Sequence, residues 1–252
     1  GAPLDVAGSV EVNAEAISAI VYVAPSTVYV DDDFAGLTLG DDPAGPGLAV
    51  GYDAFGTIQE GVDEVGDSTV YVAAGTYVEQ VLIHKDLTLQ GTDAPVVQAP
   101  GSPDSYKIAE SSAWWQPVIF AYGGSDDGSG NISGADVALV SIRDIVVDGA
   151  DRTPTGRSAG ILLRNVAGTV AGNTVQNMNI DGKETFGIMI YGDSDVTVDG
   201  NDISGYSRGG IGANGDFGAG ADPEVIIQGN TVSGPGLGVP VTWAPNGIQI
   251  GY

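Results

Sequence analysis

The sequence predicts an all-β protein that winds into a parallel β-helix, a solenoid in which each turn of short strands stacks on the last. A phrase containing Gly-Asn returns three times, at residues 172–173, 200–201 and 229–230, so its period is 28 and then 29 residues. A fixed period in this range is typical of repeats that stack on one another. The period also permits the three asparagines to form a ladder of side chains between neighbouring turns.

The pattern within one turn is the second observation. Apolar and polar residues alternate over short runs such as 196–199 and 225–228, and another kind of run opens with Gly-Ile, as at 187–190. Such alternation is typical of strands, and the intervening Gly, Asn, Asp and Ser tolerate the left-handed backbone of a sharp corner. The short gaps leave no room for crossover helices, which argues against a Rossmann or barrel fold. Hairpins are the alternative, but their turns normally use Asn-Gly rather than Gly-Asn.

The chain divides into two parts on this pattern. Residues 1–30 are expected to form N-terminal strands, and residues 31–252 the β-helix itself. Within the β-helix, residues 100–136 break the rhythm with Pro, Ser and Gly. A long insertion is therefore expected to project there from one turn.

A short capping helix is expected near residues 54–65, where Ile58, Val62 and Val65 fall on one helical face. Asp53 is the expected N-cap, because its carboxylate can accept a hydrogen bond from a free N–H of the first helical turn. The expected role of this helix is to cover the N-terminal end of the solenoid core.

The composition excludes several classes of partner. The 252 residues include 33 acidic and 8 basic side chains and no Cys, and the formal net charge is −25. Such a surface repels nucleic acid, anionic lipid and polyanionic glycans at low salt, so nucleic acid is not an expected partner. No apolar stretch approaches the roughly 20 residues of a membrane span, so no membrane insertion is expected. The acidity fits either divalent cations on Asp-rich loops or a halophilic source, and composition does not separate the two.

Four stretches carry a resemblance to a known family. They are residues 27–33, 54–62, 70–77 and 87–91. Together they look like the opening of the right-handed β-helix proteins of the pectin-lyase-like superfamily, and they are most similar to modules of large bacterial secreted and surface proteins. The resemblance implies a right-handed solenoid and a secreted or cell-surface location. It implies no single activity, because the superfamily includes polysaccharide lyases, glycoside hydrolases, adhesins and domains without chemistry.

Lys183 and Arg208 are the candidate catalytic residues if the protein is a polysaccharide lyase. Such an enzyme needs a base that removes the proton next to a uronate carboxylate, and a cation that neutralises that carboxylate. A lyase site is assembled if Lys183 and Arg208 project from neighbouring turns onto one face, with Asp181 or Asp199 holding calcium. The alternative is that these are solvated corner residues paired with nearby Asp. A glycoside hydrolase has less support, since no Asp-Asp pair is followed by a Gly-His-Gly phrase.

Calcium is the expected cofactor, because Asp in short Gly-rich loops supplies the oxygen ligands that Ca²⁺ prefers. None of these loops has the spacing of an EF-hand, and the alternative for each is solvated charge at a corner. The candidate ligands are Asp31, Asp32, Asp33, Asp126, Asp127, Asp148, Asp151, Asp193 and Asp195.

The insertion carries an aromatic cluster that is a candidate glycan-binding surface. Trp114, Trp115 and Tyr106 are the candidate residues, because aromatic faces pack on pyranose rings. Two adjacent Trp side chains cannot both point inward in an extended segment, so one is expected to be exposed or covered by the insertion itself. The alternative use of the cluster is to pack the insertion onto the solenoid.

These observations lead to two hypotheses. The first is a secreted or cell-surface structural or adhesive β-helix module, stabilised by calcium, that binds an extracellular polysaccharide or neighbouring copies of itself. The second is a polysaccharide lyase or glycoside hydrolase that acts on an extracellular polysaccharide. Self-assembly is expected if the chain is whole, because residues 250–252 form a strand-like phrase without a polar ending, and an exposed strand edge pairs readily with another subunit.

Overall fold

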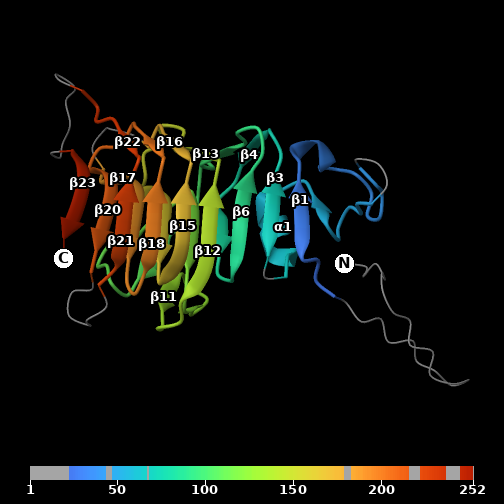
Figure 1. The fold of residues 1–252 in the computed structure, drawn as a ribbon, viewed down its shortest axis with the longest axis horizontal. Coiled ribbons are helices and arrows are strands. Elements are labelled where there is room, and N and C mark those ends of the chain that lie inside the picture. Colours follow the sequence, from blue (N-terminus) through green and yellow to red (C-terminus); the bar gives the residue numbers. More distant parts are fainter. Residues whose placement is uncertain are drawn as a thin grey trace, which may run out of the picture.

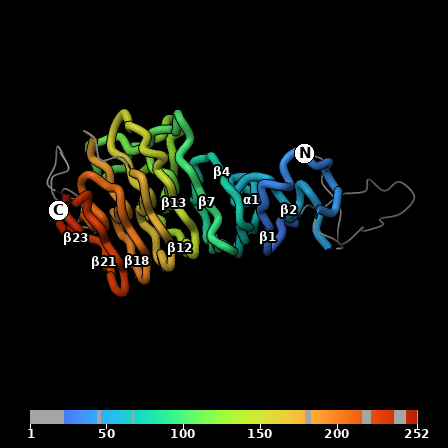
Figure 2. Tube along the Cα trace, turned by 90° about the horizontal axis from the view of Figure 1, so that it is seen from above, coloured from blue at the N-terminus to red at the C-terminus, as the bar shows by residue number. Residues whose placement is uncertain are grey.

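The computed structural model shows a solenoid of stacked coils that runs from β1 to β23 (Figures 1 and 2). Strands that are far apart in sequence lie side by side along it, and the polypeptide between them winds around the long axis. The structure describes residues 23–43, 47–66, 68–178, 183–215, 222–236 and 245–251.

Three sheets of parallel strands run the length of the solenoid, which confirms the predicted parallel β-helix. The first sheet, seen from β1 to β21 in Figure 1, contains β2 (Ala54–Phe55), β1 (Thr27–Val30), β3 (Thr69–Val72), β6 (Leu87–Gly91), β12 (Ala138–Arg143), β15 (Val166–Ala171), β18 (Asp195–Asp199) and β21 (Glu224–Gln228). The second contains β4 (Thr76–Val78), β7 (Val96–Gln98), β13 (Val146–Asp148), β16 (Thr174–Gln176), β19 (Asp202–Ile203) and β22 (Thr231–Val232). The third contains β5 (Val81–Ile83), β9 (Ile119–Tyr122), β14 (Ser158–Arg164), β17 (Thr185–Tyr191), β20 (Gly209–Asn214) and β23 (Asn246–Gly251).

The register of the first sheet reproduces the sequence period. Val170 lies opposite Val198, and Val198 lies opposite Ile227, so each turn places an aliphatic side chain directly on the one before. Neighbouring strands are about 4.8 Å apart, a spacing at which such side chains are in contact. Val170 and Val198 are buried, so burial of one continuous aliphatic column holds the turns together.

The asparagine ladder expected from the Gly-Asn phrases is present. Asn173 Nδ2 donates to Asn201 Oδ1 at 3.0 Å, and Asn201 Nδ2 donates to Asn230 Oδ1 at 2.9 Å. Each preceding glycine has a positive φ, between 64° and 67°, which a residue with a Cβ rarely adopts. The Gly-Asn order therefore has a physical cause: Gly turns the corner and Asn fills it.

The capping helix α1 (Ile58–Glu64) lies within the predicted range, but Asp53 is not its N-cap. The N-cap is Thr57, whose hydroxyl accepts from the backbone N–H of Glu60 at 3.3 Å and donates to the Glu60 carboxylate at 2.9 Å. The helix cannot begin at Asp53 because Ala54 and Phe55 form β2. The Asp53 carboxylate instead accepts from the N–H of Ala49, which ties the preceding loop together.

Helix α1 closes the core beside the first turn. Ile58 and Val62 are fully buried, and the helix packs against β1, β3 and β5. A Cβ at Gly61 would lie 2.7 Å from the side chain of Val30, so a glycine is required for this close approach. A short 3-10 helix, η1 (Asp32–Phe34), follows β1.

Of the strands expected within residues 1–30, β1 is described and pairs with β3 in the first sheet, so it belongs to the solenoid. The other expected strand, near residues 19–23, lies almost wholly outside the described residues.

The expected insertion at residues 100–136 consists of two excursions on either side of β9, which is itself part of the third sheet. They form a small three-stranded sheet from β8 (Lys107–Ile108), β10 (Ser125–Asp126) and β11 (Asn131–Ser133). Every residue of β14 and β17 is buried, because the solenoid core covers one face of these strands and the excursions cover the other. This explains why both strands read as continuous apolar runs.

A buried ion pair attaches the excursions to the solenoid. The Arg164 guanidinium donates to both carboxylate oxygens of Glu110, at 2.7 and 2.8 Å, and to the carbonyl oxygens of Gly123 and Gly134. Both side chains are almost fully buried. From the end of β14, Arg164 therefore donates hydrogen bonds to three separate residues of the two excursions.

Candidate functional site

A groove of about 930 Å³ lies where the first excursion meets the amino ends of β14 and β17. The residues that line it include Ser105, Trp114, Thr155, Arg157, Lys183 and Glu184. An aromatic ring, two cations and a carboxylate thus face one cavity.

Alternation along an extended segment places Trp114 in this groove. Trp115 points inward and is fully buried, and its indole N–H donates to the Ser111 hydroxyl at 3.1 Å. Its backbone pairs with Tyr106 in both directions, at 2.7 and 2.8 Å. Trp114 must then point outward, and it is 43% exposed. The Trp114 carbonyl accepts from the N–H of Arg157, which joins the two backbone segments that line the groove.

Glu184 organises the cations of the groove. Its carboxylate accepts from Arg157 Nε on one oxygen, and its other oxygen lies 3.9 Å from Arg208 Nε. Arg157, Glu184 and Arg208 directly precede β14, β17 and β20, which are neighbours in the third sheet. Consecutive turns of the solenoid therefore bring the three side chains together, although they are far apart in sequence.

Lys183 is exposed at the same place, directly before Glu184. Its carbonyl oxygen accepts from the hydroxyl of Ser207, and Ser207 in turn accepts from the N–H of Thr185. Those bonds hold the backbone that carries Lys183 and Glu184.

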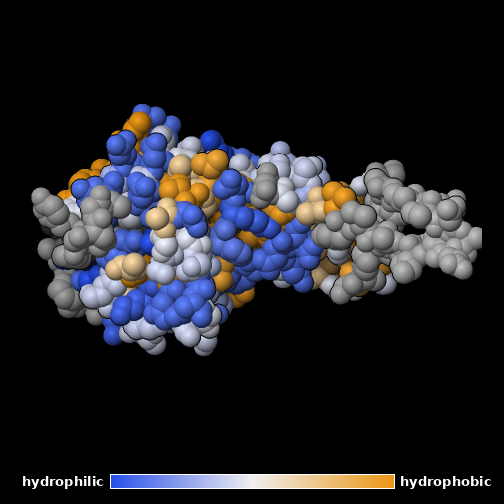
Figure 3. Space-filling model, turned by 90° about the horizontal axis from the view of Figure 1, so that it is seen from below, coloured by the Kyte–Doolittle hydropathy of each residue, from blue (hydrophilic) through white to orange (hydrophobic). Residues whose placement is uncertain are grey.

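The charge of the groove is opposite to that of the molecule. Among the described residues that line it, Arg157 and Lys183 are basic and Glu184 is acidic, and Arg208 lies 3.9 Å from Glu184, whereas the whole chain has only 8 basic residues and a net charge of −25. The face shown in Figure 3 is mostly hydrophilic, with hydrophobic residues in small separate patches. A locally positive groove on an acidic protein attracts anionic ligands to that place and away from the rest of the surface.

The structure places Lys183 and Arg208 just before the neighbouring strands β17 and β20, and Arg208 lies 3.9 Å from the Glu184 carboxylate. Of the acidic partners considered for a lyase, Asp181 lies outside the described residues, and Asp199 lies on β18 in the first sheet. Asp199 accepts from the side chain of Gln228 and does not join the groove. The catalytic role of Lys183 and Arg208 stays a prediction.

The arginine and glutamate of this site were not predicted to act together. Arg157 and Glu184 are 27 residues apart, close to one turn of the repeat. That spacing is the signal by which the pair can be found from the sequence, once the Gly-Ile runs at 160 and 187 are aligned.

Two of the three candidate glycan-binding aromatics do not reach the surface. Trp115 is fully buried and Tyr106 nearly so, in an aromatic cluster between the excursions and the third sheet. Burial raises the pKa of Tyr106 to about 12, with a smaller contribution from the charge of Asp104. A buried ring cannot present its face to a sugar, so the prediction is wrong in this respect for Trp115 and Tyr106, and Trp114 is left as the candidate.

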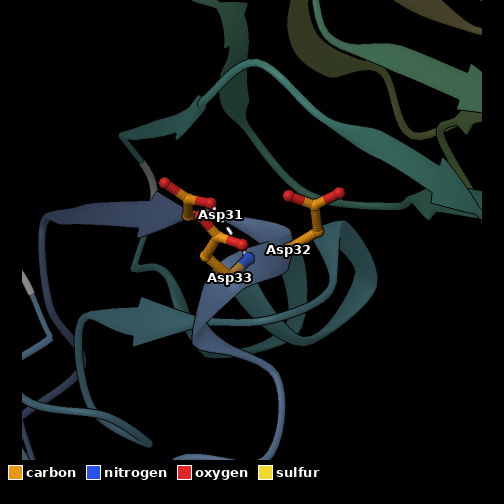
Figure 4. Close-up of side chains that lie close together, drawn as sticks. All are labelled: Asp31, Asp32 and Asp33. Atoms are coloured by element: carbon orange, nitrogen blue, oxygen red, sulfur yellow. Dashed lines mark hydrogen bonds between the residues drawn. The ribbon is translucent and has the colours of Figure 1, made fainter.

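Among the described residues, one of the predicted calcium loops brings three carboxylates together (Figure 4). One oxygen from each of Asp31, Asp32 and Asp33 lies within 4.8 Å of the others. Two of these carboxylates also hold the backbone, because Asp31 accepts from the N–H of Asp33 at 3.0 Å and Asp32 accepts from the N–H of Thr76 at 3.1 Å. The oxygen-only donor set fits Ca²⁺.

Other predicted calcium ligands bind neighbouring amides instead. Asp126 accepts from the N–H groups of Gly128 and Gly130, and Asp127 accepts from the N–H and side-chain amide of Asn131. The bond from the Asn131 side chain is the main cause that lowers the pKa of Asp127. These contacts close the tight connection between β10 and β11.

Asp148 follows the same trend. Asp148 accepts from the N–H of Ala150 and from the side-chain amides of Gln176 and Asn177. In the described part of the chain, neither Asp148 with Asp151 nor Asp193 with Asp195 joins a group of three metal-binding side chains. Among the described residues, Asp31–Asp33 is therefore the predicted loop whose three carboxylates lie close together, and calcium binding stays a prediction.

Comparison with known proteins adds one match. Residues 158–250 match a family model described as a right handed beta helix region. No curated protein and no solved structure matches the chain. Within the described residues, no helix has the length and apolar character needed to cross a membrane. The match and the three parallel sheets together identify the chain as a right-handed parallel β-helix protein, consistent with the pectin-lyase-like superfamily that its sequence resembles.

Proposed function

We propose that the protein is a secreted or cell-surface β-helix module that adheres to an acidic extracellular polysaccharide through the groove of Trp114, Arg157 and Lys183. The observation that supports this most is the combination of an exposed indole ring with two cations in one groove, on a protein that is otherwise strongly acidic. Such a groove offers both interactions that a uronate or sulfated sugar uses.

The two kinds of contact have separate physical causes. The apolar face of a pyranose ring packs on an aromatic ring, and Trp114 is exposed enough to provide one. A carboxylate or sulfate binds Lys or Arg through charge-assisted hydrogen bonds, which are about twice as strong as neutral ones. The Glu184 carboxylate orients Arg157 before any ligand arrives, so less entropy is lost on binding.

Binding of oligosaccharides by isothermal titration tests the proposal. We expect a galacturonate or alginate oligomer to bind and a neutral glucan to bind at least about tenfold more weakly, a difference of about 1.4 kcal/mol. Lys183→Ala and Trp114→Ala should each weaken binding of the acidic oligomer. Arg143→Ala is the matched control, because it removes one positive charge from β12 in the first sheet, away from the groove. Equal affinity for acidic and neutral oligomers, or equal losses for Lys183→Ala and Arg143→Ala, would contradict the proposal.

A lyase is the second candidate, favoured by the position of Lys183 and Arg208 just before neighbouring strands of the third sheet. In that reaction a base takes the proton from the carbon next to the uronate carboxylate, the glycosidic C–O bond breaks, and an unsaturated sugar forms. Ultraviolet absorbance of the unsaturated product, measured with Ca²⁺ and with EDTA, detects it. If the wild type forms product and Lys183→Ala does not, the protein is an enzyme and the adhesive role is refuted. If the wild type binds the oligomer and forms no product, the result supports adhesion.

Calcium binding by Asp31–Asp33 is part of the same proposal. The ion would join η1 to the start of β4 through Asp32 and so stabilise the N-terminal end of the solenoid. A ligand present at 100 times its Kd stabilises the folded state by about 2.7 kcal/mol, so millimolar Ca²⁺ should raise the Tm above its value in EDTA.

Two variants separate this site from general counterion binding. Asp33→Asn should abolish the rise in Tm with Ca²⁺, whereas Asp193→Asn, which removes the same charge from an exposed residue elsewhere, should keep it. An equal response of both variants would show that Ca²⁺ screens the acidic surface without occupying this site.

A further inference from the structure

A second hollow, of about 480 Å³, lies at the N-terminal end of the solenoid, where β1 and β3 end. The residues that line it include Tyr29, Asp31, Phe34, Leu48, Tyr71 and Thr92. Leu48 belongs to the loop between η1 and β2, Phe34 belongs to η1, and the others belong to β1 or β3 or directly follow β1, β3 or β6. This hollow shares no lining residue with the groove at Trp114.

Aromatic rings form much of its wall. Tyr29 and Tyr71 are paired across β1 and β3, and their rings stack with centroids 5.6 Å apart and planes 19° from parallel. Tyr29 is 42% and Tyr71 38% exposed, so both rings are open to solvent and to a ligand. Phe34, from η1, contributes a third ring to the same hollow.

The charge next to these rings is negative. Asp31 lines the hollow, and carboxylate oxygens of Asp32 and Asp33 lie within 4.8 Å of an Asp31 oxygen. None of the described residues that line the hollow is basic. The neighbouring Tyr77 shows the effect of this charge, because burial and then the charges of Asp31 and Asp32 raise its pKa.

We propose that this hollow binds a small organic cation with a quaternary ammonium group, of which choline is the simplest probe. A quaternary ammonium group spreads its charge over methyl groups that pack on aromatic faces, and the ring quadrupole and a nearby carboxylate attract that charge. Three rings, one lining carboxylate and the volume of a small-molecule pocket are the parts that such a ligand requires. A neutral sugar would use the rings without the charge, and a metal ion would use the carboxylates without the rings.

The test compares choline with 3,3-dimethylbutan-1-ol, which has the same shape and no charge. Both are titrated into the full chain, in EDTA and at physiological ionic strength, while the tyrosine signals are followed by NMR. We expect choline to bind at least about tenfold more tightly than the alcohol. Adding Ca²⁺ should weaken choline binding if the ion occupies Asp31–Asp33, because it neutralises the charge beside the rings.

Matched variants assign the contacts. Tyr71→Leu should weaken choline binding about tenfold, whereas Tyr71→Phe keeps the ring and should bind choline like the wild type. Asp31→Asn keeps a side-chain oxygen that can accept from the N–H of Asp33, so the start of η1 is preserved. It should weaken choline binding and leave binding of the alcohol unchanged.

Two results would overturn the proposal. Equal affinity for choline and the alcohol would show that the hollow selects shape without charge. Equal affinity of Tyr71→Leu and the wild type for choline would show that the cation adsorbs to the acidic surface without entering the hollow. The thermal unfolding of each variant is measured alongside, so that a loss of fold is distinguished from a loss of binding.

Discussion

Replacement of Asn201 by Ala tests the ladder that joins successive turns. Asn201 is buried, its Nδ2 donates to the Val170 carbonyl at 2.9 Å, and its Oδ1 accepts from the backbone N–H of Asn173 at 3.0 Å. Alanine leaves both backbone groups buried without these bonds, and each unsatisfied group costs about 1–3 kcal/mol. We therefore expect the free energy of unfolding to fall by about 3 kcal/mol.

Denaturant unfolding measures this loss from the shift of the midpoint at unchanged m-value. Thr197→Ala is the matched control, because Thr197 lies on β18 four residues earlier, with its side chain half-exposed on the outer face. That change should cost no more than about 1 kcal/mol. A loss for Asn201→Ala no larger than that for Thr197→Ala would refute the view that the ladder stabilises the corners.

Three further predictions concern other parts of the fold. Arg164→Met should lower the free energy of unfolding by about 3–5 kcal/mol, because it leaves the Glu110 carboxylate buried without its partner. The double variant Arg164→Met, Glu110→Met should recover much of that loss in the same unfolding assay. A double variant no more stable than the single one would contradict this reasoning. Burial raises the pKa of Glu79, although hydrogen bonds from the backbone N–H groups of Ile58 and Gln59 act in the opposite direction. The contribution of Glu79 to stability should therefore be complete below the ordinary pKa of Glu and decline as the pH rises through the raised pKa. The difference in unfolding free energy between wild type and Glu79→Gln should therefore change with pH in that interval, and a constant difference would contradict the assignment. Ile250 is 69% exposed on β23, an edge strand of the third sheet, so copies of this 252-residue polypeptide should associate through that strand at high concentration, and Ile250→Glu should abolish the association in light scattering; a polypeptide that stays monomeric would rule it out.

The repeat and the aliphatic column were predictable from the sequence because they depend on contacts that recur at one spacing. The Gly-Asn phrases gave both the period and the ladder, and the structure places their asparagines on consecutive turns. The range of the capping helix followed from Ile58 and Val62 on one face, but its N-cap did not. Thr57 and Asp53 are both good N-caps, and only the presence of β2 between them decides which one is used.

The sites were less predictable, because they depend on which way single side chains point. Adjacent Trp114 and Trp115 were expected to differ in exposure, but the sequence alone does not say which one is buried. The role of Glu184 depends on Arg157 and Arg208 from the turns before and after it, so it appears only when the strands are in register. The predicted calcium loops depend on local partners as well, because Asp126, Asp127 and Asp148 accept hydrogen bonds from amides that would compete with an ion.

A crystal structure of the protein with a galacturonate oligomer tests the central claim most directly. We expect one pyranose ring to lie against the exposed face of Trp114, with its carboxylate within hydrogen-bonding distance of Lys183 or Arg157. An oligomer bound on another face of the solenoid, or one that contacts the groove through neither the indole ring nor a cation, would contradict the claim.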